Sequence, residues 1–108
     1  MREKSPASPG GGGQPLSPLI HGRARLLILS HLIRVGPTPF TELRVLLGMT
    51  DGTLSVHVSR LAEGGVVSVE KSFIDKRPRT TIKITPAGRR GFKRYVAELR
   101  SIVPGLES

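Results

Sequence analysis

The stretch TDGTLSVHVSRLAEGG, residues 50–65, predicts one short helix with two contrasting faces. Thr50 is a typical N-cap, and the glycine pair at the other end is typical of a helix stop. One face is apolar at helical spacing and must pack against a core; it consists of Leu54, Val58, Leu61 and Ala62. The opposite face lacks the Glu and Lys pairs of an ordinary solvated helix and instead contains Gly52, Thr53, Val56, Ser59 and Arg60. We predict that this second face approaches a partner closely.

A second short helix is predicted just before the first, over residues 40–47. Its apolar residues recur at helical spacing and are Phe40, Leu43, Leu46 and Leu47. Gly48 then supplies the left-handed residue that closes many helices. Two short amphipathic helices joined by such a turn predict a helix-turn-helix, although many helical hairpins share this pattern.

A β-hairpin is predicted after these helices. A β-branched run begins at Val66 and continues to Phe73, and the segment TTIKIT, residues 80–85, alternates between apolar and polar residues. We expect residues 74–79 to form the tip, where Pro78 limits sheet extension and where the basic residues are Lys76, Arg77 and Arg79. A charged tip is either a solvated loop or a binding element. Its position directly after a helix-turn-helix favours the second interpretation.

The terminal helices are predicted to carry the dimer interface. Residues 19–35 form a helix that is apolar on two sides, one with Leu27 and His31 and the other with Leu26, Leu29 and Ile33. Such a helix needs cover on both sides, which in a small domain another subunit can supply. Thr85 and Pro86 start a final helix by capping and by proline at its first position, and its apolar stripe includes Tyr95, Leu99 and Ile102.

Composition favours a polyanionic partner. The formal net charge is +9, and residues 60–100 hold eleven basic and four acidic residues, a difference of seven. The four aromatic residues are too few for a platform that stacks single-stranded bases. Residues 1–18 are rich in Gly, Pro and Ser and are expected to be a flexible tail, with a short second tail at residues 104–108.

Several other functional classes are disfavoured. The chain has no cysteine, and His21 and His31 are ten residues apart instead of at the spacing that places two imidazoles on one helix face, so we predict no metal site and no cofactor. The motifs of common enzymes are also missing: a P-loop, a GxSxG elbow and a paired set of catalytic carboxylates. No apolar run is long enough for a membrane span, so we expect a soluble cytoplasmic protein with no membrane partner.

The segments LLGMTDGTLSVHVSRLAEGG and KRPRTTIKITPAGR together resemble the small winged-helix transcriptional regulators of the MarR and ArsR groups. The resemblance covers about residues 19–99. It implies a mainly α fold with a small antiparallel β-hairpin, in the order helix, helix, helix, hairpin, helix. It also implies a homodimer that binds double-stranded DNA, with residues 50–63 in the major groove and a wing at about residues 73–80. The thiolate metal sensing of many ArsR-like proteins is excluded here, and no small-molecule effector is implied.

From these patterns we assign the DNA-binding residues. The recognition-helix candidates are Gly52, Thr53, Ser55, Val56, His57 and Arg60, and the wing candidates are Lys76, Arg77 and Arg79. For His57, a packed or solvated role is as well supported as a DNA contact. The domain is assigned to residues 19–103. An alternative function is a winged helix that contacts another protein through Val56 and its basic wing.

Overall fold

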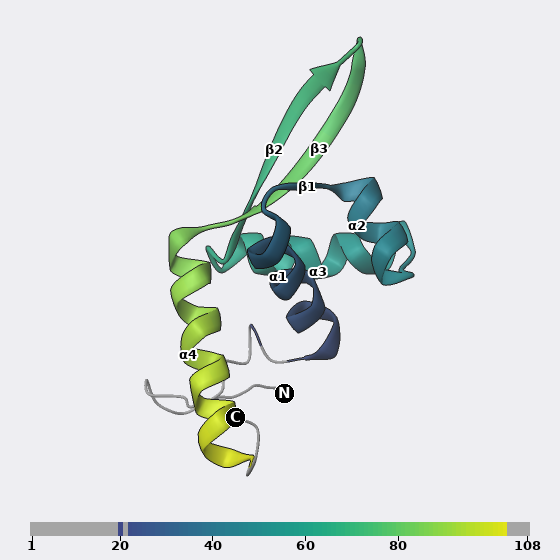
Figure 1. Ribbon diagram of the computed structural model, residues 1–108. Coiled ribbons are helices and arrows are strands. Elements are labelled where there is room, and N and C mark those ends of the chain that lie inside the picture. The colour runs from purple at the N-terminus through teal and green to yellow at the C-terminus, as the bar shows by residue number, and fades with distance from the viewer. Residues whose placement is uncertain (1–19, 21, 104–108) are drawn as a thin grey trace, which may run out of the picture.

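The computed structural model describes residue 20 and residues 22–103 (Figure 1). The elements in order are α1 (Arg23–Val35), β1 (Thr38–Pro39), α2 (Phe40–Leu47), α3 (Asp51–Glu63), β2 (Val67–Ile74), β3 (Arg77–Ile84) and α4 (Pro86–Ile102). The predicted order of helices and hairpin is confirmed. Both predicted tails, residues 1–18 and 104–108, lie outside the described residues.

The sheet contains one strand that the sequence analysis missed. It has three antiparallel strands in the order β1-β3-β2, and β1 pairs Thr38 with Ile82. Thr38 is buried, and its hydroxyl donates to the Gly36 carbonyl oxygen at 2.9 Å. A strand of two residues is too short to show alternation, so no periodicity could have indicated it.

The helices pack their apolar sides against the base of this sheet (Figure 1). The predicted apolar stripe of α3 is confirmed, because Leu54 and Leu61 have no exposed surface and Val58 is 5% exposed. The prediction for α1 was partly wrong, because the helix begins at Arg23 instead of residue 19 and two of its buried residues belong to neither predicted side. Its fully buried residues are Ile28, Leu29 and Leu32, whereas Leu27 is 40% exposed. A helix that is apolar on most sides does not specify which side meets the core, so tertiary packing decides.

Helix α4 is fixed to the body at its start. Thr85 accepts a hydrogen bond from the Gly88 amide at 2.9 Å, and its hydroxyl donates to the Gly65 carbonyl oxygen at 2.6 Å. Gly88 is buried against the Val66 backbone, where an added Cβ would clash. The predicted cap is therefore confirmed, and it also joins α4 to the end of α3. From this junction α4 extends away from the body on the side opposite to the hairpin (Figure 1).

Candidate nucleic-acid interface

The turn between α2 and α3 has the tight geometry of a helix-turn-helix. Gly48 adopts the left-handed conformation, with φ 65° and ψ 35°, as its place after α2 predicted. Its amide donates to the Val45 carbonyl oxygen at 3.2 Å, and the Met49 amide donates to the Arg44 carbonyl oxygen at 3.1 Å. These bonds satisfy the last carbonyls of α2 and direct the chain at once into α3.

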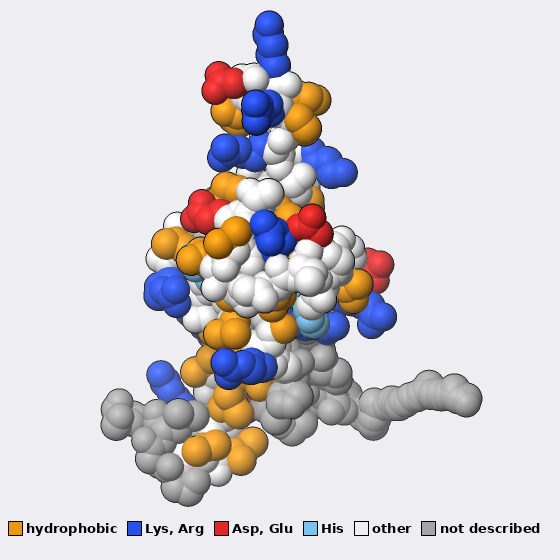
Figure 2. All heavy atoms as spheres, turned by 90° about the vertical axis from the view of Figure 1, so that its right-hand side faces the viewer, with side chains coloured by type: hydrophobic (Ala, Val, Ile, Leu, Met, Phe, Trp, Pro, Cys, Tyr) orange, Lys and Arg blue, Asp and Glu red, His pale blue; other side chains and the backbone are white. Residues whose placement is uncertain are grey.

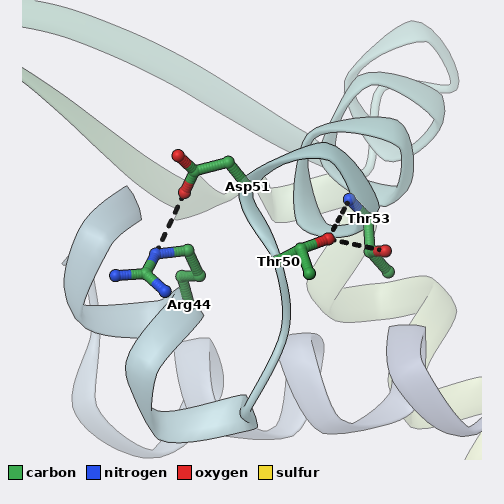
Figure 3. A network of polar contacts seen from close by, with 4 residues as sticks. All are labelled: Arg44, Thr50, Asp51 and Thr53. Carbon is green, nitrogen blue, oxygen red and sulfur yellow. Dashed lines mark hydrogen bonds and ion pairs between the residues drawn. The ribbon is translucent and has the colours of Figure 1, made fainter.

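Three polar contacts hold the beginning of α3 (Figure 3). The Thr53 amide donates to the Thr50 hydroxyl oxygen at 3.1 Å, which confirms Thr50 as the N-cap. The Thr50 hydroxyl also donates to the Thr53 hydroxyl oxygen at 2.9 Å. Because Thr53 accepts in this pair, its own hydroxyl proton remains able to donate outward.

The third contact joins α2 to α3. Arg44 Nε lies 3.0 Å from Asp51 Oδ1, and the Asp51 side chain is 82% exposed (Figure 3). A pair this exposed contributes little to the free energy of unfolding, on the order of 0–1 kcal/mol. Its effect is local: it places an acid in the first turn of α3, where the helix dipole favours negative charge. Sequence periodicity does not show this pair, because its members lie on different helices.

The outward face of α3 is exposed along its length. All the predicted recognition residues other than His57 lie on this exposed surface: Gly52, Thr53, Ser55, Val56 and Arg60. Val56 is 55% exposed although it is a large apolar residue. The face therefore combines small, hydroxyl-bearing, apolar and basic residues and is available to a partner.

Gly52 is the informative position on this face. A Cβ built at residue 52 would meet nothing within 4 Å, and its φ lies outside the left-handed range. Glycine inside a helix costs roughly 0.5–1 kcal/mol relative to alanine. Neither backbone conformation nor packing within the described chain requires a glycine here.

His57 is engaged with α1. Arg25 Nε donates to His57 Nδ1 at 3.3 Å, and the imidazole is half-buried. Partial burial and the neighbouring Arg25 guanidinium together lower the pKa of His57 below its ordinary value of 6.5. Of the two interpretations of His57, this contact supports the packed one.

The wing is a long hairpin with a tight end. Asp75 and Lys76 form the turn, with φ values of 52° and 66°. The strands run up to this turn, so the predicted six-residue tip was too wide, and Arg77 and Arg79 lie on β3, paired with Ile74 and Ser72. Pro78 is accommodated within β3 opposite Phe73, because alternate residues of an antiparallel pair point their amides away from the partner strand.

The wing candidates lie together on one face of the hairpin and at its end. Arg77 and Arg79 are two residues apart on β3, so their side chains share a face, and both are exposed, as is Lys76. Figure 2 looks onto the side of the molecule where α2 lies and shows basic and apolar side chains interleaved toward the end of the hairpin. Two further residues of β2, Lys71 and Phe73, are exposed on the hairpin but are not among the predicted wing candidates.

Two of the predicted dimer-interface residues belong to the core of the chain itself. Leu29 has no exposed surface and Tyr95 is 2% exposed, so neither has surface to offer a second subunit. Leu26, Ile33 and Leu99 are half-buried, and Ile102 is 57% exposed. Ile33 also lies beside α4 in an open, mostly apolar hollow of about 430 Å³, lined by Ile33, Phe92, Lys93, Val96, Ala97 and Arg100.

Two other kinds of feature are absent from the described part of the chain. Residues 22–103 contain no cluster of three His, Asp or Glu side chains that would hold a metal ion. Over the same residues, no helix has both the length and the apolar character needed to cross a bilayer.

Comparison with known proteins gives concordant matches. Residues 24–103 match the family model described as a winged helix DNA-binding domain. Uncharacterized protein MJ0432 of Methanocaldococcus jannaschii is 39% identical over 83 residues, covering 77% of this chain and 90% of that protein.

Solved structures of transcriptional regulators are also similar to this chain. A transcriptional regulator homologue from Pyrococcus horikoshii OT3 is 31% identical with a TM-score of 0.76, over 83% of this chain and 89% of that one. A MarR family transcriptional regulator from Silicibacter pomeroyi is 26% identical with a TM-score of 0.60, over 71% of this chain and 51% of that one. The chain therefore belongs to the winged helix DNA-binding domain family, and its structural neighbours include MarR family transcriptional regulators.

Proposed function

We propose that this chain is a dimeric, sequence-preferring regulator of transcription that binds duplex DNA in the cytoplasm and has no enzymatic activity. Helix α3 lies in the major groove, and the β2–β3 wing contacts the neighbouring backbone or minor groove. One observation carries this proposal: the exposed face of α3 has a glycine that the chain's own fold does not require. A bare backbone at that position suits close approach to a groove wall.

Each residue of the α3 face has a role that suits its chemistry. Thr53 and Ser55 donate hydrogen bonds to phosphates or base edges, and Val56 contacts a thymine methyl group. Arg60, one turn further along, contacts a phosphate or a guanine. Leu54 and Leu61, which are fully buried, hold the helix against the core so that these contacts keep a fixed geometry.

The wing supplies attraction with little sequence preference. Lys76, Arg77 and Arg79 are exposed and lie together at its end, where they neutralise phosphates and release counterions. Arginine also suits the minor groove, which basic side chains of many DNA-binding proteins contact.

The dimer pairs two copies of α3. Its interface consists of the apolar surface that α1 and α4 leave uncovered, at Leu26, Ile33, Leu99 and Ile102. Two-fold symmetry then places the recognition helices on half-sites about 34 Å apart, which favours a pseudo-palindromic operator.

A protein-binding module is the second candidate, and exposed apolar residues support it. On α2, Val45 and Leu46 are 67% and 57% exposed, and Val56 on α3 is exposed to a similar degree. Apolar surface of this kind can mark a protein contact. Weak binding to every duplex even at low salt would favour this alternative.

Selection of bound fragments from random duplex DNA, repeated at several salt concentrations, tests the proposal. We expect enrichment of a sequence with two related half-sites, and retention that falls steeply as salt rises. Retention of every fragment equally, or of none at low salt, would contradict sequence-preferring DNA binding.

A further inference from the structure

The core-facing side of the hairpin continues beyond the body of the domain. Alternate residues of β2 share a face, and on this face Val67 is 2% exposed, Val69 39% and Phe73 74%. Phe73 is thus the most exposed large apolar side chain in the described part of the chain. It lies one pair from the turn, on the part of the hairpin that projects past the helices (Figure 1).

The fold itself gives Phe73 only one direct cross-strand neighbour. Pro78 is its partner in β3, and such pairs stabilise hairpins by roughly 0.2–1 kcal/mol. With 74% of its surface exposed, however, the side chain presents most of its apolar area to solvent. Pro78 holds the backbone behind the ring stiff, because its own φ is fixed.

The charge around this ring matches a polyanion. Residues 70–79 contain four basic and two acidic side chains, all of them exposed: Lys71, Lys76, Arg77, Arg79, Glu70 and Asp75. Lys71 lies on the same face as Phe73, whereas Arg77 and Arg79 lie on the opposite face, so the projecting end carries an apolar ring with cations on both sides of the hairpin. Such an end suits a surface that has phosphates on its rim and stacked bases inside.

The width of the hairpin requires the DNA to deform. The minor groove of B-DNA is about 6 Å wide, while two strands about 4.8 Å apart with their side chains exceed that width. A two-stranded wing therefore enters only a widened groove. Apolar side chains inserted between base steps widen the minor groove by partly unstacking the bases and bending the duplex toward the major groove.

We propose that Phe73, supported by Pro78, is a wedge that the wing inserts from the minor groove between two base pairs, which partly unstacks them and bends the DNA. This inference rests on the proposed DNA-binding function. It adds a preference for a deformable base step, which the contacts of α3 do not supply. Pyrimidine–purine steps such as TA deform most easily, so we infer that the wing favours such a step beside each half-site.

Local unstacking can be measured with 2-aminopurine, whose fluorescence rises when it leaves the base stack. The probe is a duplex taken from the pool that the full chain selects, with 2-aminopurine placed in turn at each TA step and with a dye pair at its ends. We expect one position per half-site to brighten on binding, together with an increase in energy transfer between the ends. Replacing that step by a stiff A-tract step should weaken binding several-fold.

Three variants separate the wedge from charge and from folding. Phe73→Ala removes the ring and should weaken binding roughly tenfold and abolish the brightening. Phe73→Lys replaces the ring by a cation. It should also abolish the brightening, because the ring is lost, and it should make binding more salt-dependent, because a charge is gained. Ile74→Ala, the neighbouring exposed residue on the other face, is the matched control and should retain the signal. Circular dichroism and thermal unfolding of each variant verify that the hairpin has folded.

The possible results are distinct. A wild-type chain that binds the selected duplex without brightening or bending overturns the wedge and leaves the proposed function intact. Brightening that persists in both Phe73 variants also overturns it, because the ring would then not be the cause. A wild-type chain that binds no duplex overturns both proposals.

Discussion

Replacing Gly52 by alanine should make the protein more stable and a weaker DNA binder. The added methyl group meets no atom within 4 Å, and the backbone of residue 52 lies outside the left-handed region, so the folded chain accepts alanine without strain. Alanine also reduces the entropy of the unfolded chain. We expect the free energy of unfolding to rise by about 0.5–1 kcal/mol, which in a domain of this size raises Tm by roughly 2–8 °C.

The same methyl group should interfere with the DNA contact. If the α3 backbone approaches a groove wall at Gly52, a methyl group there pushes the helix outward and weakens the contacts on either side. We expect the dissociation constant for the selected duplex to rise about tenfold or more, corresponding to about 1.4 kcal/mol. Denaturant unfolding measures the first effect, and fluorescence anisotropy with labelled duplex measures the second.

A suitable control is Ser59→Ala, which lies on the same exposed helix but adds no volume. It should change affinity much less than Gly52→Ala. A Gly52→Ala protein that is more stable and binds DNA as tightly as the wild type would refute close approach at this position. A less stable protein would show instead that the glycine serves the fold.

Three further predictions concern the wing, the dimer and α3 packing. Changing both Arg77 and Arg79 to alanine should weaken binding to all sequences and reduce the magnitude of the salt slope by about one unit per lost phosphate contact; an unchanged slope would remove the wing from the mechanism. Ile102→Glu should convert the dimer to a folded monomer in sedimentation at micromolar concentration, whereas Val45→Glu, at a residue on α2 that is even more exposed, should remain dimeric. If Ile102→Glu sediments as the wild type does, α4 is not in the interface. Folding lowers the pKa of His57, so the unfolded chain binds more protons than the folded chain below pH 6.5, and the free energy of unfolding should fall as pH drops through that value. His57→Gln should lessen this fall. An equal fall in both proteins would contradict the packing of His57 against α1.

The wing experiment has a charge-matched control in α4. Arg94 and Arg100 are exposed, and α4 extends away from the body on the side opposite to the hairpin (Figure 1). Changing both to alanine removes the same charge as the wing variant does. If the wing makes direct contacts, this control should alter the salt slope less than the wing variant.

The sequence predicted the local features of the fold well because their causes are local. Thr50 and Thr85 cap helices through hydrogen bonds within three residues, and Gly48 ends α2 through its own backbone conformation. The buried stripe of α3 was also predictable, since its opposite face is polar or small. In each case one short segment contains both the cause and the result.

Features that depend on distant partners were missed. Strand β1 exists because β3 lies beside it, and the buried side of α1 was ambiguous because several of its sides are apolar. The contact between Arg25 and His57 spans 32 residues, so no helical periodicity indicates it. Leu29 and Tyr95 were assigned to a dimer because sequence cannot distinguish a core-facing apolar side chain from an interface one.

The extent of the wing was misjudged for a different reason. Pro78 suggested the end of pairing, but a proline is tolerated where its missing amide would point away from the partner strand. Pairing therefore continues to Ile74 and Arg77, and Phe73 lies on a strand near the end of the projecting hairpin. This geometry is the basis for the proposed wedge.

Methylation interference at guanine N7 on the selected duplex tests the central claim most directly, because N7 is exposed only in the major groove. If two copies of α3 read the DNA, interference should occur in two patches whose centres are about 34 Å apart along one face of the duplex, and the Thr53→Ala and Val56→Ala proteins should select altered sequences at those patches. Binding that is indifferent to methylation throughout the duplex would contradict recognition by α3 in the major groove.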